Sequence, residues 1–77
     1  MPNISYRDVP AFIVARKAFK TRTLRAVPWK SAYQVFSYAT LIAQWVPDKG
    51  WALNSAKYTA ITHKHQMMVR GALGVPT

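Results

Sequence analysis

Residues 32–46 read AYQVFSYATLIAQWV, and this stretch decides the fold. It is rich in β-branched and aromatic residues, whose side chains pack well on the pleated surface of a sheet. We therefore expect one strand at residues 32–38 and a second strand at residues 40–46.

The next four residues, Pro47-Asp48-Lys49-Gly50, are typical of a turn. Proline fixes φ, aspartate favours the bend, and glycine adopts a positive φ without strain. Residues 51–58 are then expected to form a third strand that pairs back on the second. Trp45 and Trp51 flank the turn and are expected to meet as a cross-strand pair.

A helix is expected before these strands. Asp8 can cap free amide groups at its start, and Pro10 is tolerated in its first turn. Apolar residues then recur at spacings near three and four, so the helix is expected to run from Val9 to about Phe19 or Lys20. Residues 21–31 lose this period, and Pro28 pushes the residue before it toward extended geometry, so we expect a basic connector that is mostly loop.

A second helix is expected at the C-terminal end. Thr59 or Thr62 can cap it, and Gly74 is a natural stop. Its apolar stripe consists of Met68, Val69, Ala72 and Leu73. The element order is α-β-β-β-α, which predicts an α+β domain in which two helices pack on a three-stranded antiparallel sheet.

Length and composition narrow the class of protein. The 77 residues have room for one domain, residues 1–77, and the absence of cysteine excludes disulfides and thiolate metal sites. Half of the residues are hydrophobic, which is too many for a disordered basic tail. The sequence shows neither a signal peptide nor a run of about 20 apolar residues, so we expect a cytoplasmic protein that does not span a membrane.

The charge is strongly unbalanced. Eleven Lys and Arg residues stand against two acidic residues, which gives a formal net charge of +9. Like charges repel one another in a compact domain, so a basic surface without counter-charges suggests an anionic partner. The first hypothesis is low-specificity binding of DNA or RNA, with a solvated, solubilising face as the alternative. The expected contacts are Arg16, Lys17, Lys20, Arg22, Arg25 and Lys30, with Lys64 and Arg70 as a second patch and Trp29 as an exposed stacking residue.

A second anion site is expected where the last helix starts. Thr62, His63, Lys64 and His65 would place cationic side chains in a first turn, where the helix dipole disfavours positive charge. A bound phosphate would remove this conflict, because free amide hydrogens and side-chain donors would converge on it. The alternative is that His65 packs as a neutral core residue and Lys64 is solvated.

Catalysis, cofactors and metals find no support in the sequence. His63 and His65 are two residues apart and lie on opposite sides of a helix, so they cannot share a metal there. There are no paired carboxylates, no cysteine nucleophile and no glycine-rich phosphate loop. We therefore expect a binding protein rather than an enzyme, with no cofactor.

Four segments of the chain form a recognisable pattern. They are Phe19-Lys20-x-x-x-Leu24-Arg25, Tyr33-x-Val35-x-Ser37-Tyr38-x-Thr40-x-Ile42-Ala43, Trp51-x-Leu53-Asn54 and Lys57-Tyr58-Thr59-x-x-Thr62-x-Lys64-His65-Gln66. This pattern resembles a family of small basic bacteriophage proteins of unestablished function, many from phages of actinobacteria. The resemblance covers residues 19–70, although Ile61 and His63 stand where that family usually has Thr and Ser.

The resemblance implies a phage origin, an address in the host cytoplasm and an accessory role, without a mechanism. It also motivates the second hypothesis, in which the protein docks on an acidic surface of a host protein and modulates it. A peripheral membrane role is disfavoured, because the short apolar face of the first helix is needed for the core. The open edges of a short sheet leave homodimer formation undecided.

Overall fold

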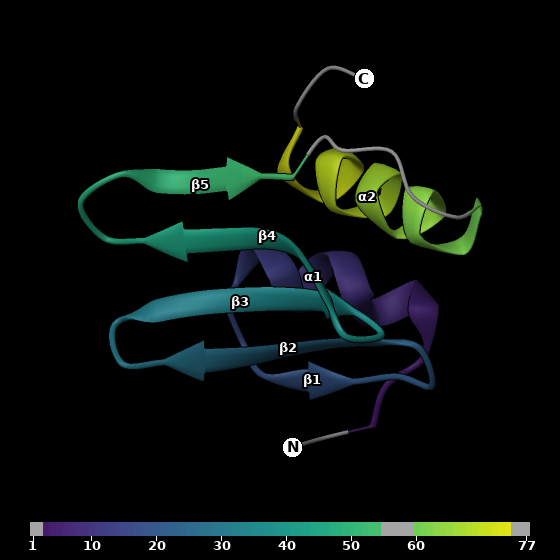
Figure 1. Cartoon of the computed structure of the whole chain (residues 1–77). Helices are drawn as coiled ribbons and strands as arrows, with labels where there is room; N and C mark the ends of the chain where they lie inside the picture. The colour runs from purple at the N-terminus through teal and green to yellow at the C-terminus, as the bar shows by residue number, and fades with distance from the viewer. Residues whose placement is uncertain (1–2, 55–59, 75–77) are drawn as a thin grey trace.

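A five-stranded antiparallel sheet forms the centre of the protein (Figure 1). The computed structural model describes residues 3–54 and 60–74. The strands follow one another in space in the order of the chain, so each pairs with its sequence neighbours. They are β1 (Phe19–Lys20), β2 (Leu24–Trp29), β3 (Ala32–Ser37), β4 (Thr40–Val46) and β5 (Gly50–Leu53).

The two strands expected at residues 32–38 and 40–46 are confirmed as β3 and β4. Side chains alternate along β3, so that Tyr33, Val35 and Ser37 are buried while the residues between them are half-buried. A bulge lies in the β3–β4 pairing, between Val35 and Phe36, where the register shifts. The extra β4 residue lets Ile42 and Ala43 both reach the core, which strict alternation would not allow.

The hairpin at Pro47–Gly50 is confirmed. Gly50 adopts a φ of 76°, and Trp45 lies opposite Trp51 in the register. The third predicted strand is shorter than expected, because β5 ends at Leu53. Its expected continuation at residues 55–58 lies outside the described residues.

The prediction for residues 15–31 is wrong in two respects. The first helix, α1 (Val9–Val14), ends well before Phe19, because Arg16 turns the chain with a φ of 53°. The N–H of Lys17 donates to the carbonyl of Phe12 (2.9 Å) and the N–H of Arg16 to that of Ile13 (3.1 Å). This pattern is a Schellman cap, in which arginine takes the position that usually holds glycine.

The chain that follows this cap forms two strands: β1 lies where the end of the helix was expected, and β2 lies where the loop was expected. Ala26 pairs with Phe19 of β1 on one side and with Val35 of β3 on the other. Pro28 lies opposite Tyr33, in the part of β2 that extends beyond β1. Its missing N–H therefore costs no ladder bond, which makes a proline compatible with this strand. The sheet consequently has five strands instead of three.

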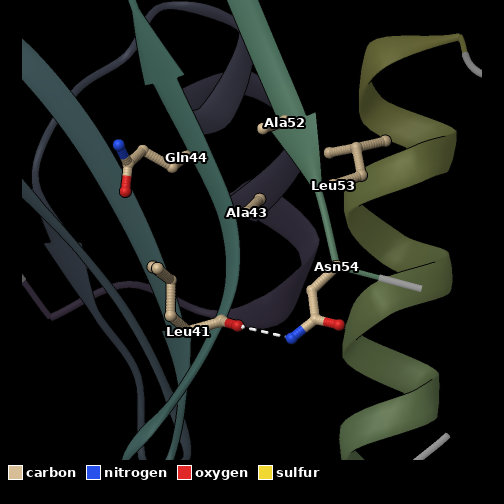
Figure 2. A pocket seen from close by; sticks show the side chains of 6 residues that line it. All are labelled: Leu41, Ala43, Gln44, Ala52, Leu53 and Asn54. Carbon is tan, nitrogen blue, oxygen red and sulfur yellow. Dashed lines mark hydrogen bonds between the residues drawn. The ribbon is translucent and has the colours of Figure 1, made fainter. Parts of the chain in front are cut away.

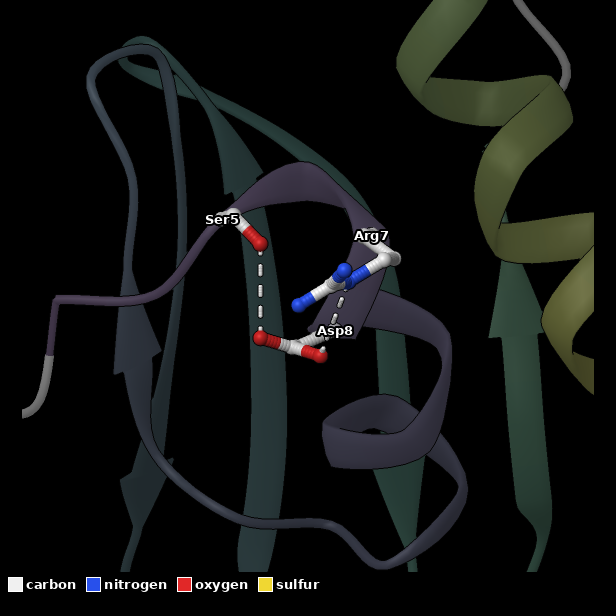
Figure 3. Close-up of polar contacts among 3 residues, drawn as sticks. All are labelled: Ser5, Arg7 and Asp8. Carbon is white, nitrogen blue, oxygen red and sulfur yellow. Dashed lines mark hydrogen bonds and ion pairs between the residues drawn. The ribbon is translucent and has the colours of Figure 1, made fainter.

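Asp8 does not cap the first helix as expected. A short 3-10 turn, η1 (Tyr6–Asp8), precedes α1, and Asp8 keeps helical backbone angles with no capping hydrogen bond from its side chain. Its carboxylate instead accepts a bond of 3.3 Å from the Ser5 hydroxyl and lies 3.9 Å from Nε of Arg7 (Figure 3). Pro10 does lie in the first turn of α1, as predicted.

The second helix, α2 (Ala60–Leu73), is confirmed. Of its two predicted caps, Thr62 lies inside the helix and is not the cap, while Thr59 falls outside the described residues. Gly74 follows the helix with a φ of 71°, as expected for its stop. Of the predicted apolar stripe, Val69 is buried, and the other members are half-buried against the core: Met68, Ala72 and Leu73.

Both helices pack on the same face of the sheet. In the view of Figure 1, α1 lies behind β3 and β4, and α2 lies beside the ends of β4 and β5.

The core lies between the sheet and the helices. The phenol of Tyr33 donates a bond of 2.7 Å to the carbonyl of Lys17, and burial raises the pKa of that phenol above 10. Neither of the described helices is long and apolar enough to cross a membrane. The core is built from Val9, Ile13, Phe19, Leu24, Ala26, Tyr33, Val35, Ile42, Ala43 and Val69.

Candidate nucleic-acid interface

One face of the sheet carries no helix, and we call it the open face. It is turned toward the viewer in Figure 1. The register assigns its members, because residues paired across two strands share a face. None of them is acidic, and two are cationic. The open face consists of Lys20, Arg25, Val27, Trp29, Ala32, Gln34, Phe36, Leu41, Gln44, Val46 and Ala52.

Aromatic and cationic side chains lie together on the open face. The side chain of Trp29 is 61% exposed, which confirms the expectation that this residue is exposed. The ammonium of Lys30 lies 5.9 Å from the centre of the Trp29 ring. The guanidinium of Arg25 lies over the ring of Phe36, 4.6 Å from its centre. Both arrangements place a positive charge beside a π-surface on which a planar group can stack.

Amide side chains occupy the middle of the open face. Gln34 and Gln44 lie opposite each other on β3 and β4, and Nε2 of Gln34 donates to Oε1 of Gln44 at 3.2 Å. A hollow of about 310 Å³ lies along β4 and β5, lined by Gln44 and Ala52 of the open face and also by Ala43 and Leu53 of the helix-bearing face (Figure 2). Asn54 lines it as well, and its Nδ2 donates to the carbonyl of Leu41 at 3.0 Å. The two glutamine amides add polar groups to the apolar surface of the open face.

Three of the predicted cations come together at one end of the sheet, in a region we call the basic corner. Lys20 and Arg25 are register partners on β1 and β2, and Arg22 lies in the turn between these strands. Together they line a cleft of about 160 Å³. The basic corner comprises Lys20, Thr21, Arg22, Thr23, Leu24, Arg25 and Tyr38.

The other predicted cations lie elsewhere, so the charge run at residues 16–30 does not form one patch. Arg16 stacks on Trp45 at 4.1 Å, and the pairing of Trp45 with Tyr33 places this contact on the helix-bearing face. Lys30 lies in the β2–β3 turn, at the end opposite the basic corner. Lys17 is exposed after α1.

The two cations predicted for the second patch lie on α2. Lys64 is exposed and lines a mainly apolar cavity of about 330 Å³ with Thr23 and Tyr6, whereas Arg70 is half-buried further along the helix. Among the described residues, Lys64 is thus the α2 cation nearest to the basic corner, since Thr23 lines both hollows.

Thr23 ties the basic corner to three other elements. Its hydroxyl forms hydrogen bonds with the phenol of Tyr6 in η1 and with Nε2 of His65 in α2, the latter at 3.2 Å. Its carbonyl accepts the backbone N–H of Tyr38 at 2.8 Å. These bonds fix the turn that presents Arg22.

The structure does not support an anion site at Thr62–His65. The helix starts at Ala60, and Thr62 and His65 point into the protein, where they are 5% and 3% exposed. Ser37 donates to Oγ1 of Thr62 at 3.1 Å, so Nδ1 of His65 donates to Ser37 at 2.6 Å. Nε2 then accepts from the hydroxyl of Thr23. His65 is therefore a hydrogen-bonded core residue, and only His63 and Lys64 of this segment are exposed.

Burial and the neighbouring Lys64 lower the pKa of His65 below 6.5. The unfolded chain therefore binds a proton at a higher pH than the folded protein does. We expect full stability above about pH 6.5 and a progressive loss as the pH falls from there through the folded pKa. Protonation would disrupt the hydrogen bonds of the His65 ring, because both nitrogens of the neutral ring already have partners. Urea unfolding between about pH 7.5 and 5 measures the resulting change in stability. His65→Gln should flatten the profile, whereas His63→Gln should leave it unchanged; equal slopes in the two variants would contradict this role of His65.

No group of three metal-ligating side chains occurs among residues 3–54 and 60–74. Ser37 and His65 form the one Ser–His contact that the described residues show, but Ser37 is fully buried, so its hydroxyl cannot meet a substrate. This contact could not be predicted from the sequence, because the two residues are far apart along the chain.

Fold and site together define a small basic α+β domain with one bare sheet face. The chain belongs to a family of unknown function, DUF8033, whose family model matches residues 2–74. No curated protein matches the chain, and no solved structure does.

Proposed function

We propose that this protein binds single-stranded nucleic acid across the open face with low sequence specificity. The observation that carries the proposal is a helix-free sheet face on which Trp29 is exposed and Arg25 lies over an aromatic ring, with no acidic residue on it. One face of an antiparallel sheet is often solvated, but such a face usually carries mixed polar residues. Here the face combines the two features that hold a nucleic-acid strand, stacking surface and positive charge.

A single strand fits this face better than a duplex does. In a duplex the bases are stacked on one another, so an indole on a broad sheet cannot reach their faces. In a single strand one base can stack on Trp29 and another on the guanidinium of Arg25, which Phe36 supports from below. The distance between the two stacking positions is spanned by the backbone, whose phosphates meet Lys20 and Lys30.

Low specificity follows from the kind of contact. Every base has a π-face, so stacking accepts all four bases, and phosphate contacts carry no sequence information. The amides of Gln34 and Gln44 can reach base edges, but they already bond with each other. The expected result is a modest preference among bases.

Fluorescence anisotropy with a labelled oligothymidylate or oligouridylate of about ten nucleotides tests the proposal. With about four phosphate contacts, from Lys20, Arg22, Arg25 and Lys30, the plot of log K against log salt should have a slope near −3. A duplex of the same sequence should bind more weakly. Absence of binding to either single strand at about 50 mM salt would end the proposal.

A matched pair of lysine variants separates local contacts from net charge. Lys20→Gln and Lys49→Gln each remove one charge from an exposed lysine, but Lys20 lies on the open face and Lys49 lies in the β4–β5 turn. We expect Lys20→Gln to reduce the steepness of the salt dependence by about 0.7 and Lys49→Gln to leave it nearly unchanged. An equal reduction in both variants would show that only the overall charge matters.

The second candidate function is binding to an acidic host protein, and a related experiment tests it. The basic corner and Trp29 would serve such a partner as well, because aromatic and arginine side chains dominate many protein interfaces. A pull-down from host lysate before and after nuclease treatment decides between them. Loss of the captured material with nuclease supports nucleic acid, and retention of one acidic protein contradicts it.

A further inference from the structure

We propose that the basic corner binds the phosphate monoester at the end of a nucleic-acid strand, with the terminal base on Tyr38. This inference rests on the proposed function, because it gives the bound strand an anchored end. It adds a site that the stacking argument does not require, since the cleft also takes in the β1–β2 turn and Tyr38, which lie outside the open face.

The cleft is small and three cationic residues line it. Its volume of about 160 Å³ is well below the range of about 300–1,000 Å³ that is usual for drug-sized ligands. Lys20, Arg22 and Arg25 line it, and no acidic residue does. Their donors can therefore be satisfied together by a compact anion with several oxygens.

The charge of the cleft favours a strand end over an internal phosphate. An internal phosphodiester carries one negative charge. A monoester carries about 1.5 to 2 negative charges at neutral pH and three free oxygens. Three cations around one small cleft match the second group better, and arginine can hold two of its oxygens at once.

The turn that forms the cleft is held in place before any ligand binds. The hydroxyl of Thr21 accepts the backbone N–H of Leu24 at 2.9 Å, and the N–H of Thr21 donates to the carbonyl of Leu24 at 2.7 Å. Thr23 adds the bonds to η1, α2 and Tyr38 described above. A fixed turn loses little entropy when a ligand binds, which favours affinity for a small anion.

Tyr38 lines the cleft from the turn between β3 and β4. Its φ of 55° belongs to this turn, just as Lys30 has a φ of 56° in the β2–β3 turn. Its N–H donates to the carbonyl of Thr23 at 2.8 Å, and its side chain stays 52% exposed at the cleft. The ring is therefore available to stack on the base next to a phosphate in the cleft.

The test compares strands that differ only at their ends. Oligothymidylates of about ten nucleotides are prepared with a 5′-phosphate, with a 3′-phosphate and with hydroxyl groups at both ends. A hydroxyl-ended strand that is one nucleotide longer controls for the added charge. We expect one phosphorylated strand to bind at least fivefold more tightly than both hydroxyl-ended strands. Arg22→Gln should abolish this preference, and Lys49→Gln should retain it.

A titration with a nucleoside 5′-monophosphate or 3′-monophosphate, followed by amide NMR, examines the corner by itself. Shifts at residues 21–24 and at Tyr38 with one of them, and not with the nucleoside, would support the inference. Equal affinity for all strands, with no such shifts, would overturn it while leaving the proposed function intact. Shifts from the mononucleotide without any strand binding would retain the corner site and contradict the proposed function.

Discussion

Replacing Trp29 with alanine is expected to weaken the binding of single-stranded nucleic acid by about 5- to 150-fold. Trp29 is the most exposed of the large aromatic side chains in the described part of the chain, and it lies at the edge of the open face. Stacking of one base on an aromatic side chain contributes about 1–3 kcal/mol, which corresponds to this range of affinities. Anisotropy titration at fixed salt measures the change.

The Trp29→Ala variant should stay folded, because its indole contributes little to the core. Its urea midpoint should therefore lie close to that of the wild-type protein. Val14→Ala is the matched control, since Val14 is 56% exposed but lies on α1, on the other side of the sheet. If Trp29→Ala bound as tightly as Val14→Ala, the indole would have no part in binding.

Phe19→Ala is expected to have the largest effect on stability. Phe19 is fully buried and packs edge to face against Phe12, with ring centres 6.1 Å apart. Truncating a buried Phe to Ala costs about 3–5 kcal/mol, and a domain of this size has roughly that much stability in total. The variant should therefore be largely unfolded at 25 °C, which circular dichroism and urea titration would show.

Phe36→Ala is the counterpart on the opposite face of the same sheet. Phe36 is half-buried on the open face, so its removal should cost about 1 kcal/mol and leave the domain folded. Because Phe36 supports Arg25, this variant should lose affinity for nucleic acid while it keeps its secondary structure. If Phe36→Ala unfolded the domain and Phe19→Ala did not, our assignment of the two faces would be wrong.

The strands at residues 32–46 and the following hairpin could be predicted because their signals are local. β-branched and aromatic residues mark β3 and β4, and Gly50 has the positive φ that its turn requires. The last helix could also be predicted, because the apolar residues around Val69 recur with helical spacing.

The first two strands could not be predicted, because tertiary pairing decides them. β1 has two residues and acquires its conformation only by lying beside β2. Arg16, which ends α1 in a left-handed conformation, is a residue type that gives no stop signal. Pro28 predicted a break in any strand, because proline cannot donate a ladder hydrogen bond. It is tolerated in β2 because its nitrogen lies beyond the end of β1, where no ladder bond is required.

The candidate site was predictable in its composition and not in its arrangement. The cations and the exposure of Trp29 follow from the sequence, but the split of the charge run depends on where the strands turn. Lys20 and Arg25 lie side by side because β1 and β2 form a hairpin, whereas Arg16 stacks on Trp45 on the other face of the sheet. The sequence left two roles for His65 open, an anion contact and a neutral core residue, because its partners, Ser37 and Thr23, come from distant strands and turns; the structure supports the second.

Amide and indole NMR of the labelled protein with an unlabelled single strand of about ten nucleotides examines the interaction most directly. If bases lie on the bare side of the sheet, the largest shifts will come from the indole N–H of Trp29 and from β2, β3 and the β1–β2 turn. The amides of α1 and of the second half of α2 will then stay nearly unchanged. Shifts confined to the two helices, or none at all at saturating strand, would contradict that placement.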